Sequence, residues 1–166
     1  KIRAVASSMH SADLARKGGI EVLDINDVSH IDTTVDGADE IDPQYRMIKG
    51  AGGAHVREKI LACSSSKMIV IIDETKWVSH LGKAKLPVEV LFYGAPSTRG
   101  RLERLGFQGE WRRNPDETLF TTENGNLLFD IQFDFPLSHP EVEDRKIRSI
   151  PGVIDTGFFF GIASSV

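Results

Sequence analysis

Two aspartates in the stretch VDGADEID, residues 35–42, are of a residue type and at a spacing that suit a proton-transfer site. Asp36 and Asp39 are separated only by Gly37 and Ala38, so no bulky side chain keeps a ligand away from them. Because a predicted strand ends at Asp36, both carboxylates are expected at one rim of a sheet. Carboxylates that share a site can move protons when their surroundings push their pKa values apart.

The other two acids of this stretch fit a simpler interpretation. Glu40 and Asp42 are typical of a solvated turn, because Asp and Gly are common turn residues. A calcium loop does not fit, since its alternating oxygen ligands and its closing glutamate are absent from the sequence. No metal is needed to explain these acids.

A short glycine run follows. In KGAGG, residues 49–53, Lys49 precedes the glycines and a predicted helix comes next. Backbone N–H groups in such a run can approach an anion closely, and a helix N-terminus favours negative charge. A nucleotide P-loop is excluded, because its lysine follows the glycines. The run also fits a plain loop, but its place between the acids and a helix favours an anion site.

Glu58 lies on the helix predicted for residues 53–64. At about 100° per residue it shares a helix sector with apolar side chains, whereas its neighbours Arg57 and Lys59 project elsewhere. A solvated surface glutamate is the alternative. A carboxylate sheltered from water would have a raised pKa suited to proton abstraction. Its sector contains Ala54, Leu61 and Ala62, and a different face contains Val56, Ile60 and Cys63.

One further lysine and five histidines complete the polar candidates. Lys76, just beyond a predicted buried strand, can reach the same rim, although a lone surface lysine is the simpler interpretation. The histidines lack metal-ligand spacing and are interpreted as surface or capping residues. They stand at positions 10, 30, 55, 80 and 139. The sequence has no nucleophile elbow, CxxC pair or dinucleotide fingerprint.

The elements that must position these residues alternate in the first half of the chain. Residues 2–6 and 20–25 are predicted strands around a helix at 7–19, and a third strand ends at Asp36. Residues 67–73 are nearly all apolar, as in strands buried on both faces. This order predicts a Rossmann-like, mostly parallel α/β sheet, whose ligands collect at the carboxyl ends of the strands.

The second half has the order β-α-β-β-α-β, which predicts a smaller ferredoxin-like α+β unit. Asn124-Gly125 is a strong signal for a two-residue turn. Some aromatic residues of FDIQFDF and DTGFFFG are expected to face a partner subunit. The predicted strands are 86–94, 107–113, 118–122, 126–134 and 153–160, and the predicted helices are 97–106 and 139–150.

We expect two domains without a flexible linker. A Rossmann-like catalytic domain is expected at residues 1–85, a ferredoxin-like domain at 86–161, and the start of a segment returning to the first domain at 162–166.

Composition narrows the class of protein. Of the 166 residues, 40% are apolar, which is enough for a core, and the net charge of −4 leaves no positive stripe for nucleic acid. The single cysteine, Cys63, excludes an internal disulfide and a thiolate metal cluster. No apolar run approaches membrane-spanning length, and no secretory signal is evident. We expect a cytoplasmic protein that binds neither nucleic acid nor membrane.

Taken together, these stretches resemble the ribose-5-phosphate isomerase A family. VDGADEID is followed in order by MIKGAGGAHVREKI, IIDETK, LGKAKLPVEV, ENGN and IPGVIDTGFF. The resemblance covers essentially the whole chain, and an ordered series is far more specific than one motif. It implies an aldose–ketose isomerase of the pentose phosphate pathway that interconverts ribose 5-phosphate and ribulose 5-phosphate. It also implies no metal or organic cofactor, and a homodimer or homotetramer.

The resemblance also implies residue roles. Glu58 corresponds to the general base that moves a proton between C2 and C1 through an enediolate. Asp36 and Asp39 bind the sugar hydroxyls, and Asp36 assists ring opening. Lys49 and the N–H groups of residues 50–52 stabilise the oxyanion, at about 3 kcal/mol per well-placed donor. The implied substrate-binding set is Asp36, Gly37, Ala38, Asp39, Lys49, Gly50, Ala51, Gly52 and Lys76, of which Lys76 meets the substrate or its phosphate.

Two features depart from the family pattern. Ala51 interrupts a run that is usually all glycine, which is tolerable only if residue 51 does not need positive φ. Family members also carry an N-terminal phosphate-gripping loop and a further C-terminal end, for which this sequence has no counterpart. We therefore expect a fragment, or a sequence that omits disordered ends, and we expect the 166-residue chain alone to bind phosphate poorly. Equal turnover by this chain and by one with its natural N-terminus restored would contradict that expectation.

Two other functions stay open at this point. Related folds serve as sugar-phosphate sensors in transcription regulators, which would carry a helix-turn-helix and would not need Glu58. A coenzyme A transferase half on the same fold would form a covalent glutamyl adduct, which hydroxylamine traps after incubation with an acyl-CoA. One lysine, two aspartates and a helix glutamate favour proton transfer over both, because function follows the site rather than the fold.

Overall fold

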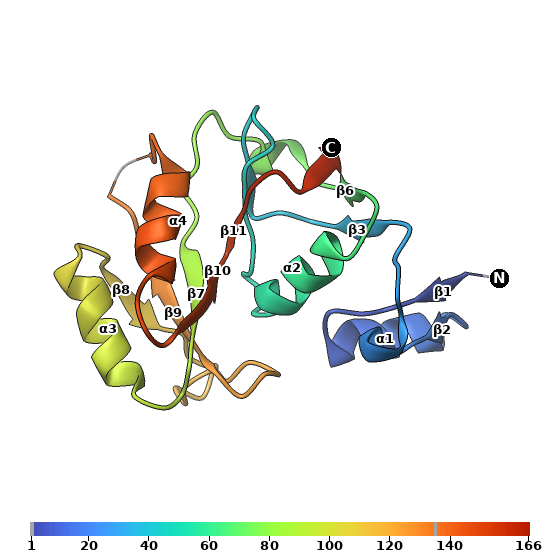
Figure 1. Ribbon diagram of the computed structural model, residues 1–166, viewed down its shortest axis with the longest axis horizontal. Helices are drawn as coiled ribbons and strands as arrows, with labels where there is room; N and C mark the ends of the chain where they lie inside the picture. Colours follow the sequence, from blue (N-terminus) through green and yellow to red (C-terminus); the bar gives the residue numbers. More distant parts are fainter. Residues whose placement is uncertain (1, 135) are drawn as a thin grey trace.

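The structure, a computed structural model, describes residues 2–134 and 136–166 as a mixed α/β fold (Figure 1). The helices are α1 (Met9–Lys17), α2 (His55–Cys63), α3 (Ala95–Arg104) and α4 (Pro140–Arg148), with short 3-10 helices η1 (Ile25–Asp27) and η2 (Glu74–Lys76). The strands are β1 (Arg3–Ala4), β2 (Glu21–Val22), β3 (Thr34–Asp36), β4 (Glu40–Ile41), β5 (Met47–Ile48), β6 (Met68–Val70), β7 (Leu86–Val90), β8 (Gly109–Trp111), β9 (Leu127–Ile131), β10 (Val153–Thr156), β11 (Phe158–Phe159) and β12 (Ala163–Ser165).

The first elements form the predicted strand–helix–strand unit. β1 and β2 pair in parallel, with Arg3 opposite Glu21. The Ser8 hydroxyl accepts a hydrogen bond from the Ser11 N–H at 3.1 Å and so satisfies one of the free N–H groups at the start of α1. The helix ends at Gly18, as its sequence predicts. Figure 1 shows this unit around the N-terminus, at one side of the molecule.

A parallel sheet of β3, β6 and β12 carries the first acids. β3 and β12 flank β6, and Asp36 at the end of β3 pairs with Val70 at the end of β6. Beyond Val70 the chain leaves the sheet, and Ile71 is 66% exposed. The predicted strand at 67–73 is therefore shorter than expected, because its pairing with β3 ends at the hydrogen bond from the Ile71 N–H to the Asp36 carbonyl at 2.9 Å.

A hairpin of β4 and β5 follows Asp36, where the sequence indicated only a turn. The interpretation of Glu40 and Asp42 as solvated turn residues is wrong, because they are 3% and 1% exposed. Glu40 accepts a hydrogen bond from the Gly82 N–H at 2.8 Å, and Asp42 pairs with the Arg46 guanidinium at 2.6 Å. A buried carboxylate requires such partners, so both acids stabilise the fold.

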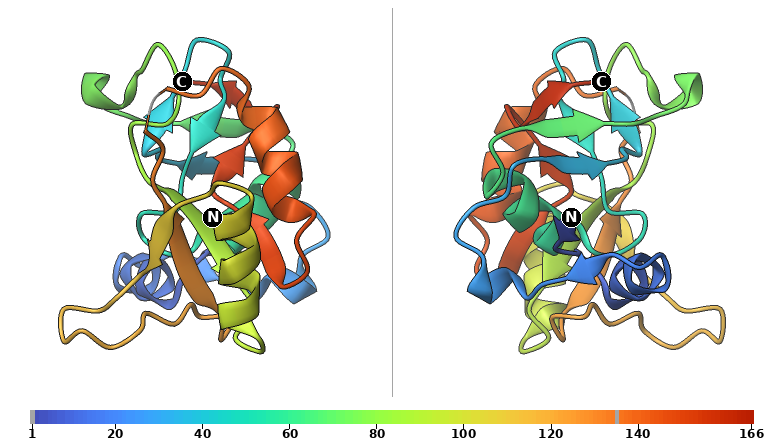
Figure 2. Two further views of the ribbon diagram at one scale, coloured as in Figure 1. Left: turned by 90° about the vertical axis from the view of Figure 1, so that its left-hand side faces the viewer. Right: turned by 90° about the vertical axis from the view of Figure 1, so that its right-hand side faces the viewer.

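The predicted β-α-β-β-α-β order of the second half is confirmed. β7, α3, β8, β9, α4 and β10 follow one another, and their strands form one antiparallel sheet in the order β10-β7-β9-β8. Figure 2 shows α3 and α4 on the same face of this sheet. Pro140 occupies the first turn of α4, where its missing N–H costs no helix hydrogen bond.

One predicted hairpin differs in detail. Residues 118–122 form isolated bridges rather than a strand. The turn at Asn124-Gly125 is a three-residue connection, closed by a hydrogen bond from the Thr122 N–H to the Asn126 carbonyl at 2.8 Å. Gly125, but not Asn124, has positive φ, at 80°. This pattern matches a three-residue hairpin loop with glycine in the left-handed position, instead of the predicted two-residue turn.

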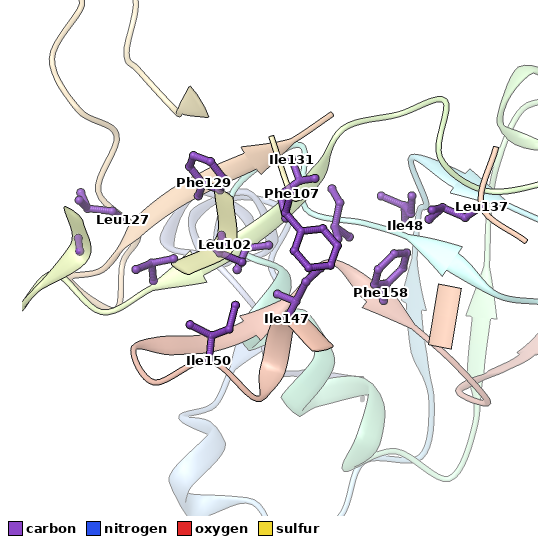
Figure 3. Close-up of a cluster of buried hydrophobic side chains, with 14 of the residues drawn as sticks. Ile48, Leu102, Phe107, Leu127, Phe129, Ile131, Leu137, Ile147, Ile150 and Phe158 are labelled. Carbon is purple, nitrogen blue, oxygen red and sulfur yellow. The ribbon is translucent and has the colours of Figure 1, made fainter. Parts of the chain in front are cut away.

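A large hydrophobic core lies between this sheet and its two helices (Figure 3). Phe129 of β9 and Leu102 of α3 are both fully buried there. Of the aromatic residues in FDIQFDF and DTGFFFG, some of which are expected to face a partner subunit, Phe129, Phe158 and Phe159 cannot do so, because they are at most 2% exposed. Phe135, in the same stretch, lies outside the described residues. The aromatic rings therefore mainly fill the core of this chain.

Gly157 fixes the Lys49 backbone against the second half of the chain. It separates β10 from β11, its N–H donates to the Pro87 carbonyl at 2.7 Å, and its own carbonyl accepts from the Lys49 N–H at 2.8 Å. A Cβ at residue 157 would collide with the Lys49 carbonyl oxygen. The predicted strand at 153–160 is therefore interrupted at a glycine that allows this close approach.

Replacing Gly157 by alanine is expected to lower the free energy of unfolding by about 1–3 kcal/mol, because the added methyl must displace Lys49 or Pro87. Gly100→Ala is a control of opposite sign. Gly100 lies inside α3, and a Cβ added there would be 3.5 Å from Arg104 Nη1, an ordinary contact distance. Alanine should therefore raise the free energy of unfolding by up to about 1 kcal/mol. Urea unfolding measures both, and a Gly157→Ala protein as stable as the unsubstituted chain would contradict the expectation.

Candidate active site

Three of the predicted residues meet in one cluster. Lys49 Nζ lies 3.0 Å from Asp36 Oδ2 and 3.2 Å from Glu58 Oε2. Asp36 ends β3, Lys49 directly follows β5, and Glu58 lies in the first turn of α2. Three separate elements therefore place one cation between two carboxylates.

The Lys49 ammonium group is almost enclosed, with 4% of the side chain exposed. It donates a hydrogen bond to the Gly37 carbonyl at 2.5 Å and lies 5.5 Å from the centre of the Phe159 ring. Burying an ammonium group is costly unless the group is paired and hydrogen-bonded. These partners supply that compensation, and they hold the charge in the fixed position that stabilisation of an oxyanion requires.

Glu58 is sheltered from water, as its helix sector predicts, with 15% of its side chain exposed. Burial raises the pKa of Glu58, the positive charge of Lys49 opposes this shift, and the charges of Asp36 and Asp39 add to it. Its Oε2 atom is buried and, although Lys49 is near, forms no well-aligned hydrogen bond. A carboxylate in this state is suited to accept a proton from carbon.

The chain neighbours of Glu58 hold α2 from two directions. Arg57 Nε donates to Asn124 Oδ1 at 2.7 Å, in the hairpin loop. Lys59 Nζ lies 2.9 Å from Asp155 Oδ1, on β10. Burial lowers the pKa of Lys59, and the charge of Asp155 opposes that shift. Both cations project away from Glu58, as predicted, and they fix the rotation of the helix that carries it.

The glycine run forms a tight loop before α2. Gly50 and Gly53 have positive φ of 106° and 85°, and the Gly53 N–H donates to the Gly50 carbonyl at 2.9 Å. Ala51 has negative φ, so the alanine fits the loop without strain. Its N–H, expected to face an oxyanion, donates instead to Asp39 Oδ2 at 2.9 Å. The loop therefore positions the second aspartate.

The remaining predicted residues differ in how close they come to this cluster. Gly37 and Ala38 connect the two aspartates, and Gly52 lies within the glycine loop. Lys76 ends η2, which Asp73 caps by accepting a hydrogen bond from the Thr75 N–H. Within the described residues the Lys76 side chain forms no hydrogen bond or ion pair, so neither kind of contact joins it to Glu58 or Lys49.

The interpretation of His55 as a surface or capping residue is wrong. His55 begins α2, is fully buried, and packs so closely on Gly50 that a Cβ there would lie 2.9 Å from the histidine Cβ. Burial lowers the pKa of His55 to about 4, and the charge of Glu89 opposes this shift. The sequence does contain one signal for this burial. His55 lies three residues before Glu58, and residues three apart on a helix share a side, so a sheltered Glu58 implies a sheltered His55.

Two observations concern possible metals and membranes. Among residues 2–134 and 136–166, no three His, Cys, Asp or Glu side chains are grouped so that they could hold a metal ion. In the same ranges, no helix has both the length and the apolar character needed to cross a membrane.

Similarity to known proteins extends over nearly the whole chain. The family model described as ribose 5-phosphate isomerase A (phosphoriboisomerase A) matches residues 3–166. The chain belongs to the ribose 5-phosphate isomerase A family. Ribose-5-phosphate isomerase A of Protochlamydia amoebophila (strain UWE25) is 45% identical over 166 residues, which are 100% of this chain and 72% of that relative.

Solved structures of ribose 5-phosphate isomerases share the fold. The crystal structure of ribose 5-phosphate isomerase A from Neisseria gonorrhoeae has a TM-score of 0.88 and 38% identity, and the match covers 96% of this chain and 69% of that chain. A structure of D-ribose-5-phosphate isomerase in complex with phospho-erythronic acid has a TM-score of 0.89 and 34% identity. The match covers 96% of this chain and 70% of that chain. The predicted family and α/β fold class are confirmed.

In this ribose 5-phosphate isomerase A family member, the pKa of Glu58 is expected to respond to its charged neighbours. Lys49→Met removes the positive charge that lowers the pKa, so the pKa should rise further. Asp36→Asn removes a negative charge that raises it, so the pKa should fall. NMR titration of the side-chain carboxyl carbons measures both, with Lys146→Met on the surface of α4 as the control. A Glu58 pKa that stayed unchanged in both variants would show that the charges of Lys49 and Asp36 do not control it.

Proposed function

We propose that this chain interconverts D-ribose 5-phosphate and D-ribulose 5-phosphate through an enediolate, with Glu58 transferring the proton. As a member of the ribose 5-phosphate isomerase A family, the chain is an aldose–ketose isomerase. The observation that supports Glu58 as the base is its sheltered carboxylate beside the buried Lys49 ammonium. Neither the sensor nor the coenzyme A transferase alternative is the family that matches.

The reaction moves hydrogen between two carbons of one substrate. With the sugar ring open, Glu58 removes the proton from C2, the C2–H electrons form the C1=C2 bond, and the carbonyl electrons pass to O1. O1 then gains a proton and O2 loses one, after which the Glu58 carboxylic acid returns its proton to C1 and O2 becomes the ketone oxygen. Substrate and product contain the same atoms and the same number of electrons, so the step itself requires no redox partner. A general base contributes about 10²–10⁴-fold to such a step.

The neighbours of Glu58 are proposed to stabilise the charge that this step creates. Lys49 faces the oxyanion with a fixed positive charge, and the loop N–H groups of Gly50 and Gly52 add donors. Asp36 and Asp39 bind the sugar hydroxyls, and Asp36 assists ring opening. The ion pairs of Lys49 with both carboxylates support this arrangement, because a prearranged charge needs no reorganisation during the reaction.

The ligand of one related structure supports the charge pattern of this proposal. That D-ribose-5-phosphate isomerase is in complex with phospho-erythronic acid. The carboxylate of this acid places negative charge on oxygen at the end of a phosphorylated polyol chain, as an enediolate does. We propose that the present chain binds the same class of anion, with Lys76 close to the phosphate.

Glu58→Gln keeps the shape of the side chain but removes the base, so kcat should fall by about 10²-fold or more while KM changes little. Conversion of ribose 5-phosphate to the ketose measures the rate, and exchange of the C1 hydrogen of ribulose 5-phosphate in deuterium oxide should slow in parallel. Glu110→Gln, exposed on β8, is the matched control and should keep full activity. A loss of only a fewfold in the Glu58→Gln variant would rule out the proposed base.

We also propose that the chain works in the cytoplasm as a homodimer or homotetramer. The support for association is the apolar run after β7, in which Leu91, Phe92 and Tyr93 are 41%, 64% and 87% exposed, since contiguous apolar patches often mark interfaces. Replacing Phe92 and Tyr93 by serine should shift sedimentation towards the monomer. An unsubstituted chain that sediments as a monomer at every concentration would contradict association.

A further inference from the structure

Arg112 connects the antiparallel sheet to the glycine loop of the candidate active site. It directly follows β8, and its side chain is 16% exposed. Its Nε donates to Asp130 Oδ2 at 2.9 Å and its Nη2 donates to Asp130 Oδ1 at 2.6 Å. This two-bond pairing with a β9 carboxylate fixes the plane of the guanidinium group.

The third nitrogen of Arg112 points at the loop. Nη1 donates to the Gly50 carbonyl at 3.0 Å and to the Ala51 carbonyl at 2.9 Å, although these residues lie about sixty positions earlier in the sequence. The Phe120 ring, whose centre is 5.8 Å from the Arg112 guanidinium carbon, lies so close to Gly53 that any Cβ there would contact it. Two side chains of the second half therefore hold the loop at both of its ends.

These carbonyl contacts determine where the loop N–H groups point. In a trans peptide the carbonyl and the following N–H lie on opposite sides, and the described residues contain no cis peptide bond. With the Gly50 and Ala51 carbonyls turned towards Arg112, the N–H groups of Ala51 and Gly52 must point away from it. The Ala51 N–H indeed reaches Asp39 Oδ2 on that side, at 2.9 Å. The same argument turns the Gly52 N–H away from Arg112, because the Ala51 carbonyl accepts from it.

We propose that Arg112 is a positioning residue for the isomerisation. It orients the peptide groups of residues 50–52 so that the Ala51 N–H donates to Asp39 and the Gly52 N–H faces the developing oxyanion. This inference rests on the proposed function, because it gives those N–H groups a task in catalysis. Arginine suits the position better than lysine, since a planar fork with several N–H groups can bind a carboxylate and two carbonyls at once. An ammonium group cannot span these four oxygens in a fixed geometry.

Arg112→Ala tests the proposal by kinetics. The kcat should fall by about 10-fold to 10²-fold while KM stays within about threefold, because loop groups that act on the transition state are displaced. Inhibition by phospho-erythronic acid, an anion in place of the enediolate, should weaken by a similar factor. Millimolar guanidinium should restore part of kcat by occupying the vacated position, whereas the same concentration of urea should not.

Arg113→Ala is the matched control. Arg113 is the exposed neighbour of Arg112, and its guanidinium bonds to the Glu117 carbonyl rather than to the loop, so kcat should be unchanged. Arg112→Lys provides a second test if the alanine variant does not fold, because it keeps a positive charge beside Asp130 but cannot hold both carbonyls. Its kcat should also fall by about 10-fold or more with little change in KM.

The outcomes separate this proposal from the proposed function. A folded Arg112 variant with the kcat of the Arg113→Ala protein, or with a loss confined to KM, would overturn the positioning role. The positioning role would also be overturned if guanidinium did not restore the kcat of Arg112→Ala and Arg112→Lys kept the kcat of the unsubstituted protein. Neither result would affect Glu58, since the Glu58→Gln variant tests the base independently.

Discussion

A single buried cation determines the arrangement of the candidate active site. The Lys49 ammonium lies within 3.2 Å of carboxylates from β3 and α2, two elements that share no backbone pairing. Removing one partner of a buried ion pair typically costs about 3–5 kcal/mol, because the other charge is left unpaired. The fold must therefore bring Asp36 and Glu58 together to accommodate the lysine. Stability and the proposed proton transfer depend on the same contacts.

The strands around this cluster are too short to hold it by pairing alone. β3 has three residues and β5 has two, whereas strands of five or six residues are usual. Contacts from distant segments supply the remaining constraint. Gly157 holds the Lys49 backbone, and Arg57 and Lys59 attach α2 to the hairpin loop and to β10. The second half of the chain thus serves as the support on which the residues of the first half are arranged.

Local sequence signals predict the helices and the main chemistry of this protein, but not its buried polar contacts. Pro140 and the residues around Ser8 mark helix starts, and the apolar neighbours of Glu58 on its helix predict its shelter. Glu40 could not be recognised as buried, because its partner Gly82 lies 42 residues later and leaves no periodic signal. His55 was missed for a different reason: its place three residues before Glu58 is a weak signal of burial, and a histidine without metal-ligand spacing is more often a surface residue.

The contact between Lys59 and the Thr156 carbonyl joins residues that are 97 positions apart. A polypeptide made from its N-terminus therefore contains the lysine and both carboxylates of the cluster long before it contains β10. Contacts of such long sequence separation form late and slow the folding of a domain, because the entropy of closing the intervening loop is lost first. Until β10 has been synthesised and has docked, the nascent chain therefore carries Asp36, Lys49 and Glu58 without the contacts that fix their geometry.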